Sequence, residues 1–206
     1  MTYRSVFKPG LFEGRTVVVT GGGSGIGRCT AHEIAALGAH VVITGRKQEK
    51  LDKVRAEIEA AGYRVQSHGQ KTYNGVALLS RADAQDVVKN IPGHADPQAR
   101  VIAATVGSVR VIGAYMPNGQ APGTDKFEYK MQWLRALRDW VEGELAVHPR
   151  LVLMGDYNIA PEDRDVYDPE LWRGQILCTD EERTHFDKLI ALGLHDGAAT
   201  LSARDD

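Results

Sequence analysis

Hydrophobic and polar residues in the first third of the chain are arranged in a pattern that predicts strands and helices in turn. The runs "RTVVVT" (15–20) and "HVVITG" (40–45) are rich in β-branched residues, which is typical of strands buried on both faces. Each run is followed by apolar residues at helical spacing. Residues 15–62 therefore predict the order strand, helix, strand, helix, with the two strands parallel.

The two predicted helices follow from this periodicity. The first would place Ile26, Ile34 and Leu37 roughly on one face and would stop near Gly38. The second covers 47–61 and carries three apolar residues at 3-4 spacing. Both helices are therefore expected to pack one apolar face against the strands.

Beyond residue 62 the strand candidates are shorter and closer together. They are 75–80, 100–106, 109–115 and the buried run 150–156. The "GS" pair at 107–108 predicts a tight turn and hence antiparallel pairing. An apolar stripe predicts a long helix over 126–146, whose aromatic and basic residues are better explained as a core face than as a nucleic-acid surface. Thr179 and Glu182 form a capping box ahead of a last helix.

Composition and charge narrow the class of protein. A chain with 43% hydrophobic and 25% charged residues is an ordinary globular composition, and its net charge of −2 gives no global attraction to a polyanion. Two cysteines, Cys29 and Cys178, form no disulfide framework, and the histidines lack paired ligand spacing, which predicts surface or capping roles for them. We expect a cytoplasmic protein without a membrane span, and nothing indicates its oligomeric state.

The stretch "TGGGSGIG" (20–27) has the spacing of a dinucleotide-binding turn. Gly21 and Gly25 allow close approach of a pyrophosphate, and Gly27 allows the helix to pack against the strand. The helix N-terminus adds N–H groups and a positive dipole. The candidate cofactor-binding residues are Thr20, Gly21, Ser24, Gly25, Ile26, Gly27 and Arg46.

Because of this turn and the strands and helices around it, residues 8–61 resemble the start of a short-chain dehydrogenase/reductase. The resemblance implies binding of NAD or NADP, and Arg46 after the second strand favours the 2′-phosphate of NADP. The chemistry of that family needs a tyrosine followed four residues later by a lysine, and none of the seven tyrosines has one. One alternative is therefore a segment that binds NADP without hydride transfer.

A second resemblance covers residues 61–206. The blocks that carry it are "HGQKTYNGVALLS" (68–80), "VIGAYMPNG" (111–119), "RLVLMGDYNIAPEDRDVYDP" (150–169) and "DEERTHFDKLIALGLHD" (180–196). In this order they resemble the exonuclease III type of the endonuclease/exonuclease/phosphatase family. The resemblance implies an α/β sandwich and Mg²⁺-dependent cleavage of DNA, as an abasic-site endonuclease or 3′–5′ exonuclease in DNA repair.

The resemblance also assigns roles to four residues. Asp156 would activate or orient the attacking water, and Asn158 would hold the scissile phosphate. Tyr115 would act on the leaving group or phosphate, and Asn118 would contact the DNA backbone. Taken alone, Asp156 and Asn158 could simply form an Asx turn, and Tyr115 could be a core aromatic residue.

Several residues that the nuclease family needs have no counterpart, so we assign no metal ligand. If the first segment replaces the opening elements of the nuclease, Thr20-Gly21 stands in place of an asparagine and Gly45-Arg46 in place of the metal-binding glutamate. The chain also ends at Asp206, before the expected C-terminal Asp-His pair. We therefore predict inactive or severely impaired hydrolysis, and a non-functional fusion product is a further alternative.

In fold class, the sequence predicts an α/β chimera with two parts. Residues 1–62 would form a Rossmann-like β-α-β-α segment, and residues 63–206 a partial exonuclease III-like sandwich without its last strands.

Overall fold

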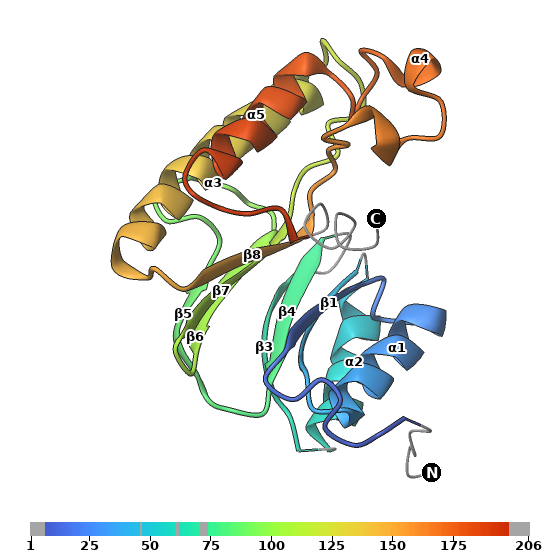
Figure 1. The fold of residues 1–206 in the computed structure, drawn as a ribbon, viewed down its shortest axis with the longest axis vertical. Helices are drawn as coiled ribbons and strands as arrows, with labels where there is room; N and C mark the ends of the chain where they lie inside the picture. Colours follow the sequence, from blue (N-terminus) through green and yellow to red (C-terminus); the bar gives the residue numbers. More distant parts are fainter. Residues whose placement is uncertain (1–6, 46, 61, 71–73, 198–206) are drawn as a thin grey trace. The chain divides into compact units, whose positions relative to one another are not determined.

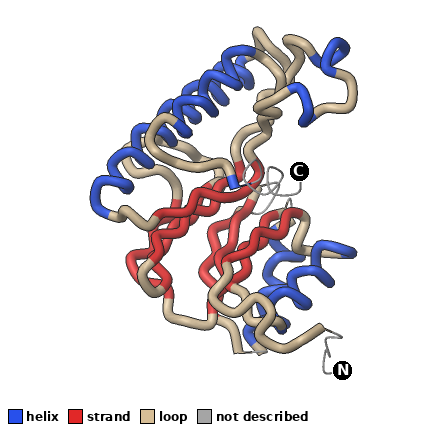
Figure 2. Tube along the Cα trace, in the orientation of Figure 1, coloured by secondary structure: helices blue, strands red, loops and turns tan. Residues whose placement is uncertain are grey.

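The computed structural model describes residues 7–45, 47–60, 62–70 and 74–197 (Figure 1). As predicted, the protein is mixed α/β, and the described residues form two four-stranded sheets (Figure 2). Two compact units divide the chain. The first comprises Met1–Tyr115 and Glu144–Asp156, and the second comprises Met116–Gly143 and Tyr157–Asp206.

The first sheet of the first unit joins strands from both sides of residue 62. Its members are β1 (Thr16–Thr20), β2 (His40–Thr44), β3 (Arg64–Gly69) and β4 (Gly75–Ser80), in the order β1-β2-β4-β3. Strands β1 and β2 are parallel, as predicted, whereas β4 runs antiparallel to β2 and β3. Helices α1 (Gly25–Ala36) and α2 (Gln48–Glu59) cover one face of this sheet (Figure 1). The domain boundary near residue 62 stays a prediction, and it falls between two elements of one folded unit.

The second sheet packs against the other face of the first. It has the order β5-β6-β7-β8, with β5 (Ala84–Lys89), β6 (Val101–Val106), β7 (Val109–Tyr115) and β8 (Leu151–Asp156). The turn at 107–108 joins β6 and β7 as an antiparallel hairpin, as predicted, and β8 is parallel to β7. Buried side chains of β2, β4, β6 and β7 fill the space between the sheets. The first unit is therefore a two-sheet sandwich.

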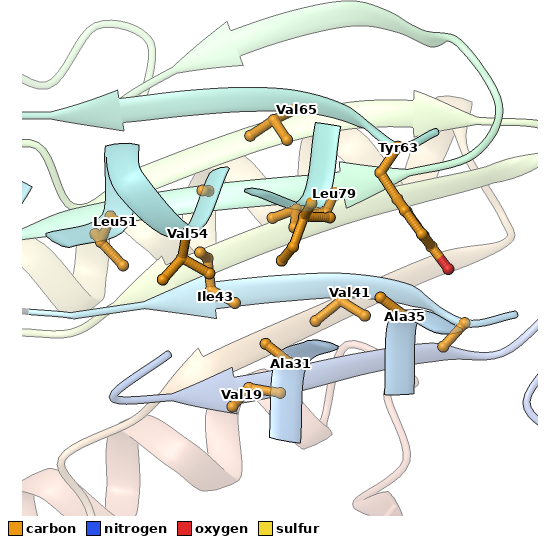
Figure 3. Packing of buried hydrophobic residues seen from close by; sticks show 13 residues of the cluster. Val19, Ala31, Ala35, Val41, Ile43, Leu51, Val54, Tyr63, Val65 and Leu79 are labelled. Atoms are coloured by element: carbon orange, nitrogen blue, oxygen red, sulfur yellow. The ribbon is translucent and has the colours of Figure 1, made fainter. Parts of the chain in front are cut away.

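Strand β2 supplies apolar side chains to both of its faces. Val41 and Ile43 pack under α1 and α2 with Leu51 of α2, as Figure 3 shows. Val42 points the other way into the layer between the sheets. There it comes so close to Gly113 of β7 that a Cβ at Gly113 would lie 3.4 Å from the Val42 side chain. The continuous apolar run in the sequence reflects this double burial.

The second unit is built on the long helix α3 (Asp125–Val147), whose last residues belong to the first unit. The predicted apolar stripe of α3 is buried, and α5 (Asp180–Ile190) lies beside it (Figure 1). The predicted capping box at Thr179 and Glu182 opens α5. Between β8 and α5 lie only a 3-10 turn (Asp163–Asp165) and the short α4 (Pro169–Trp172). Every helix of the described residues is too short or too polar to span a bilayer.

Some local expectations were wrong. Ile26 is 87% exposed, because Ala31 and Ala35 form the buried face of α1 and Ile26 lies about 180° around the helix from Ala35. Strand β8 is only partly buried along its length. Strands β3 and β5 gave no signal, since their residues are mostly polar and the pairing of β5 is irregular between Gln85 and Val88.

The close packing of α1 on the glycine-rich turn predicts the effect of adding one methyl group. A Cβ at Gly27 would lie 2.4 Å from the backbone oxygen of Gly21, so Gly27→Ala forces a backbone shift. We expect a loss of about 1–3 kcal/mol in the free energy of unfolding, measured by urea denaturation. The matched control is Gly143→Ala in α3, where a Cβ meets nothing within 4 Å, and we expect it to be neutral or stabilising by about 0.5–1 kcal/mol. A Gly27→Ala variant as stable as the parent chain would contradict this packing.

Candidate functional site

The glycine-rich turn has the backbone conformation that its sequence predicts. Gly21 (φ 68°) and Gly25 (φ 53°) are in the left-handed region, which side chains other than glycine rarely adopt. The N–H of Gly22 donates to the oxygen of Thr44 at 3.1 Å and so ties the turn to the end of β2. Gly27 packs directly on the backbone of the turn. Glycine is therefore favoured at Gly21 and Gly25 by the backbone conformation and at Gly27 by close packing.

The candidate cofactor residues lie together at this turn, except for Arg46, which lies outside the described residues. Thr20 is exposed at the end of β1, and Ser24 is the N-cap of α1. The Ser24 side chain makes no capping hydrogen bond, and no acidic residue occupies the first turn of α1. Ile26, the second residue of α1, is exposed. The positive end of the helix dipole is thus not offset by a nearby carboxylate in that turn.

The sheet around the turn differs from that of a dinucleotide-binding domain. In a doubly wound sheet the first strand lies between parallel neighbours. Here β1 is a terminal strand of its sheet within the described residues, and β2 pairs with the antiparallel strand β4. The turn keeps a phosphate-binding shape, whereas the parallel sheet that would carry the rest of a dinucleotide site is absent from the part of the chain described.

A second candidate site lies where β7 and β8 end in the first unit. Tyr115 and Asp156 are the last residues of these parallel strands and are register partners. Gly155 precedes Asp156 with φ 141°, and a Cβ there would lie 1.8 Å from the oxygen of Ala114. Glycine is therefore required before the aspartate, which explains the Gly-Asp pair of the motif.

Arg100 fixes the position of Tyr115. The guanidinium carbon of Arg100 lies 5.3 Å from the centroid of the Tyr115 ring, which is a cation–π distance. Its Nη1 donates to the backbone oxygen of Tyr115 at 3.1 Å, and its Nη2 donates to Oε1 of Gln98 at 2.7 Å. Arg100 is buried, so it places a positive charge beside the phenol with little screening by water.

The ends of β1 and β2 carry no carboxylate. Thr20 and Thr44 are the last residues of these strands and are register partners. No group of three or more His, Cys, Asp or Glu side chains in the described part of the chain could hold a metal ion. Mg²⁺ prefers several oxygen ligands, commonly from carboxylates. The described residues therefore do not fit the metal site that the nuclease resemblance implies.

The two candidate asparagines lie in the second unit and contact each other. Nδ2 of Asn118 lies 3.3 Å from Oδ1 of Asn158, and Nδ2 of Asn158 donates to the oxygen of Met116 at 2.9 Å. Oδ1 of Asn118 accepts from the N–H of Gln120 at 3.1 Å. Asn158 has φ 49°, a conformation that asparagine tolerates. Both amide groups are therefore held in fixed orientations.

Sequence patterns did not predict a buried ion pair that contacts the loops of these two asparagines. Lys130 of α3 and Glu182 of α5 are fully buried and paired with each other. Nζ of Lys130 also donates to the backbone oxygens of Asn158 at 2.6 Å and Asn118 at 3.2 Å. The signal was a lysine within the apolar stripe of α3, three residues after Phe127 and four before Leu134.

Two further ionisable groups of the second unit are shielded from water, His185 almost fully and Tyr157 in part. Burial raises the pKa of Tyr157, and the negative charge of Asp196 adds to this effect. Tyr157 packs edge-on against Phe186 at 5.9 Å. The surface role expected for the histidines was wrong for His185, which is 6% exposed. Both side chains therefore contribute to the packing of the second unit.

Comparisons with known proteins follow the two resemblances. The family model for short chain dehydrogenases matches residues 15–108. Exodeoxyribonuclease III of Haemophilus influenzae is 31% identical over 156 residues, covering 70% of this chain and 58% of the relative. A Neisseria 3′ phosphatase, NExo, solved bound to a product DNA hairpin, is 42% identical with a TM-score of 0.78, over 88% of this chain and 71% of that chain. The larger part of this chain belongs to the exonuclease III family.

The exonuclease III likeness reaches into the dehydrogenase-like segment. An AP endonuclease of Archaeoglobus fulgidus also matches 88% of this chain and 70% of its own, at 27% identity and a TM-score of 0.75. A match of 88% leaves about 25 of the 206 residues unmatched, fewer than the 60 that precede residue 61. Part of the β-α-β-α segment therefore shares the exonuclease III fold, as expected if it replaces the opening elements of the nuclease. The chain spans only 58% and 50% of the exodeoxyribonucleases of H. influenzae and Bacillus subtilis.

Burial of His185 predicts a pH-dependent stability of the second unit. Burial lowers the pKa of the His185 imidazole, and the positive charges of Lys188, Arg135 and Arg138 lower it further. The unfolded state, with a histidine pKa of about 6.5, thus binds the proton more readily than the folded state. We expect stability to be greatest above about pH 6.5 and to fall as the pH drops below it. The measurement is urea unfolding followed by tryptophan fluorescence, since all three tryptophans lie in this unit.

The variant His185→Gln should flatten this dependence between about pH 7.5 and 5.5. The matched control, His195→Gln, changes an exposed histidine of the same unit and should leave the dependence as it is. A pH profile that is the same in the parent chain and in His185→Gln would contradict the assignment.

Proposed function

We propose that this chain is a DNA-binding protein of the exonuclease III kind whose phosphodiester hydrolysis is severely impaired. The observation that supports this best is the contrast between two pairs of strand ends. The ends of β7 and β8 carry Tyr115 and Asp156 in register, the residue types that the nuclease family uses. The ends of β1 and β2 carry Thr20 and Thr44, which offer no carboxylate.

The candidate residues have roles that their chemistry allows. Asp156 can accept a proton from water or orient it, and the phenol of Tyr115, beside the charge of Arg100, can donate to a phosphate or leaving oxygen. Asn118 and Asn158 are neutral donors suited to phosphate oxygens. An amide group has two N–H bonds, so the contact of Asn118 with Asn158 leaves its second N–H for a ligand. These assignments rest on the exonuclease III family resemblance.

We expect impaired hydrolysis because the described strand ends around Asp156 offer too few ligands for a metal ion. A carboxylate such as Asp156 is a weak catalyst of phosphate ester hydrolysis without a cation to offset the charge that develops on the phosphate. Within the described residues no set of side chains around it would hold that cation. Contact with DNA depends on amide and phenol donors, which do not need the metal. Binding should therefore persist where cleavage is lost.

The experiment compares binding with cleavage in the same protein. The parent chain is titrated against a fluorescein-labelled duplex with a central abasic-site analogue, and anisotropy is measured in EDTA. The variant Asn118→Asp keeps the acceptor for Gln120 but replaces a donor by a negative charge, so its Kd should rise about 10-fold or more. The control Gln132→Ala removes an exposed polar residue of α3 and should bind like the parent.

Cleavage of a true abasic-site duplex is then measured in Mg²⁺. We expect no product above the protein-free control. Robust Mg²⁺-dependent cleavage that Asp156→Asn abolishes would overturn the proposed impairment. Equal affinity of the parent and Asn118→Asp, or no affinity at all, would overturn the proposed DNA contact.

A second candidate function is NADP binding without chemistry, which the conformation of the glycine-rich turn supports. The positive φ values of Gly21 and Gly25 leave the backbone of the turn open to a pyrophosphate. NADPH fluorescence tests this directly. Saturable binding to the parent chain should be lost in Gly25→Val, where a β-branched residue would be strained at φ 53°. A signal that does not saturate, or that Gly25→Val retains, would exclude this function.

A further inference from the structure

The buried pair of Lys130 and Glu182 is hydrogen-bonded to the two loops of the second unit that carry the candidate phosphate-contacting amides. The ammonium group of Lys130 has three hydrogens, and three acceptors are among its partners. They are the carboxylate of Glu182 and the backbone oxygens of Asn118 and Asn158. One cation therefore connects α3, α5 and the two loops that carry the asparagines.

Stability alone gives a weak reason for this arrangement. Taking two charges out of water is costly, and well-packed apolar residues often replace a buried ion pair with no loss of stability. Apolar residues cannot, however, donate hydrogen bonds to loop carbonyls. The oxygens of Asn118 and Asn158 lie outside helices and strands, where a buried carbonyl without a partner is unfavourable. What the lysine provides beyond packing is control of these two loops.

The loop after Asn118 is also shaped by the aliphatic part of Lys130. Gly119 has φ 88°, and a Cβ there would lie 2.9 Å from Cδ of Lys130 and 3.1 Å from Ile176. The next residue, Gln120, has φ 60°. The chain thus turns tightly against the lysine stem, and the turn sets the direction of the Asn118 amide.

Glu182 is itself fixed by several donors, so it cannot easily follow a displaced lysine. Its Oε1 accepts from the N–H of Leu177 at 3.1 Å, and its Oε2 accepts from the N–H and hydroxyl of Thr179 at 3.1 and 2.7 Å. The oxygen of Leu177 in turn accepts from the N–H of Ala160 at 2.8 Å, two residues after Asn158. The carboxylate is therefore a fixed point to which the loops are tied.

We propose that Lys130 is a positioning residue, held by Glu182, that orients the Asn118 and Asn158 amides together for contact with a phosphate of DNA. This inference rests on the proposed function for its ligand. It predicts that loss of the lysine loosens both loops at once, although they are 40 residues apart in the chain.

The test uses the full chain and the double variant Lys130→Met with Glu182→Gln, which removes both charges and leaves none buried alone. Backbone amide hydrogen exchange should become at least 10-fold faster in residues 118–120 and 158–160, with little change in the middle of α3. Anisotropy titration of the abasic-analogue duplex should show a Kd raised at least 5-fold. A role in stability alone would raise exchange across the whole unit by a common factor, and that result would overturn the proposal.

The matched control is a second buried pair, Arg110 with Glu144 in the first unit, changed to Met and Gln. It should leave exchange at both asparagine loops unchanged. If the Lys130 double variant does not fold, Lys130→Arg keeps the charge but changes the donor geometry, and a rise in Kd at unchanged thermal midpoint supports positioning, whereas an unchanged Kd contradicts it. If the parent chain binds no DNA, the proposed function fails, while exchange at the two loops still decides whether Lys130 positions them.

Discussion

The antiparallel pairing of β2 with β4 is the interaction on which the first unit depends. It joins a strand of the dehydrogenase-like segment to a strand of the exonuclease III-like part. Backbone hydrogen bonds can join strands of either resemblance, but the side chains of β2 must pack on both faces of the first sheet. A strand from a parallel sheet is apolar on both sides, and β2 uses Ile43 against the helices and Val42 against the second sheet. This explains how such a segment can serve in a sandwich.

The same physics separates the fold from the chemistry. Any β-branched strand of the right length can fill the ladder and the core, whereas a metal ligand requires a particular atom at a particular strand end. Thr20 and Thr44 satisfy the first requirement and fail the second. On the other sheet, Gly155 allows the close approach of β8 to β7, and Asp156 follows it with its carboxylate. The fold therefore places weaker demands on the residues at these strand ends than a metal site would.

Sequence patterns predicted the elements whose signal is local. The β-branched runs, the turn at 107–108, the stripe of α3 and the capping box of α5 each depend on neighbours within a few residues. The prediction failed where residues distant in the sequence determine whether a strand forms or a side chain is buried. Strands β3 and β5 exist because partners hold them, and Ile26 is exposed because alanines form the face of α1. His185 and Lys130 are buried by packing between α3 and α5, which no periodicity within one helix reveals.

The candidate residues of the exonuclease III part are held in place by two different means. Tyr115 and Asp156 depend on the register of β7 and β8, in the unit that also contains the dehydrogenase-like segment. The backbone oxygens of Asn118 and Asn158 accept hydrogen bonds from Lys130, which pairs with Glu182, and all four residues belong to the second unit. The ends of β1 and β2 lie in the same unit as Tyr115 and Asp156, and the hydrogen bonds from Lys130 to the asparagine loops do not involve these strand ends. Under the proposed function, contact with DNA and cleavage of DNA therefore depend on residues with separate supports, and a result on one of them does not decide the other.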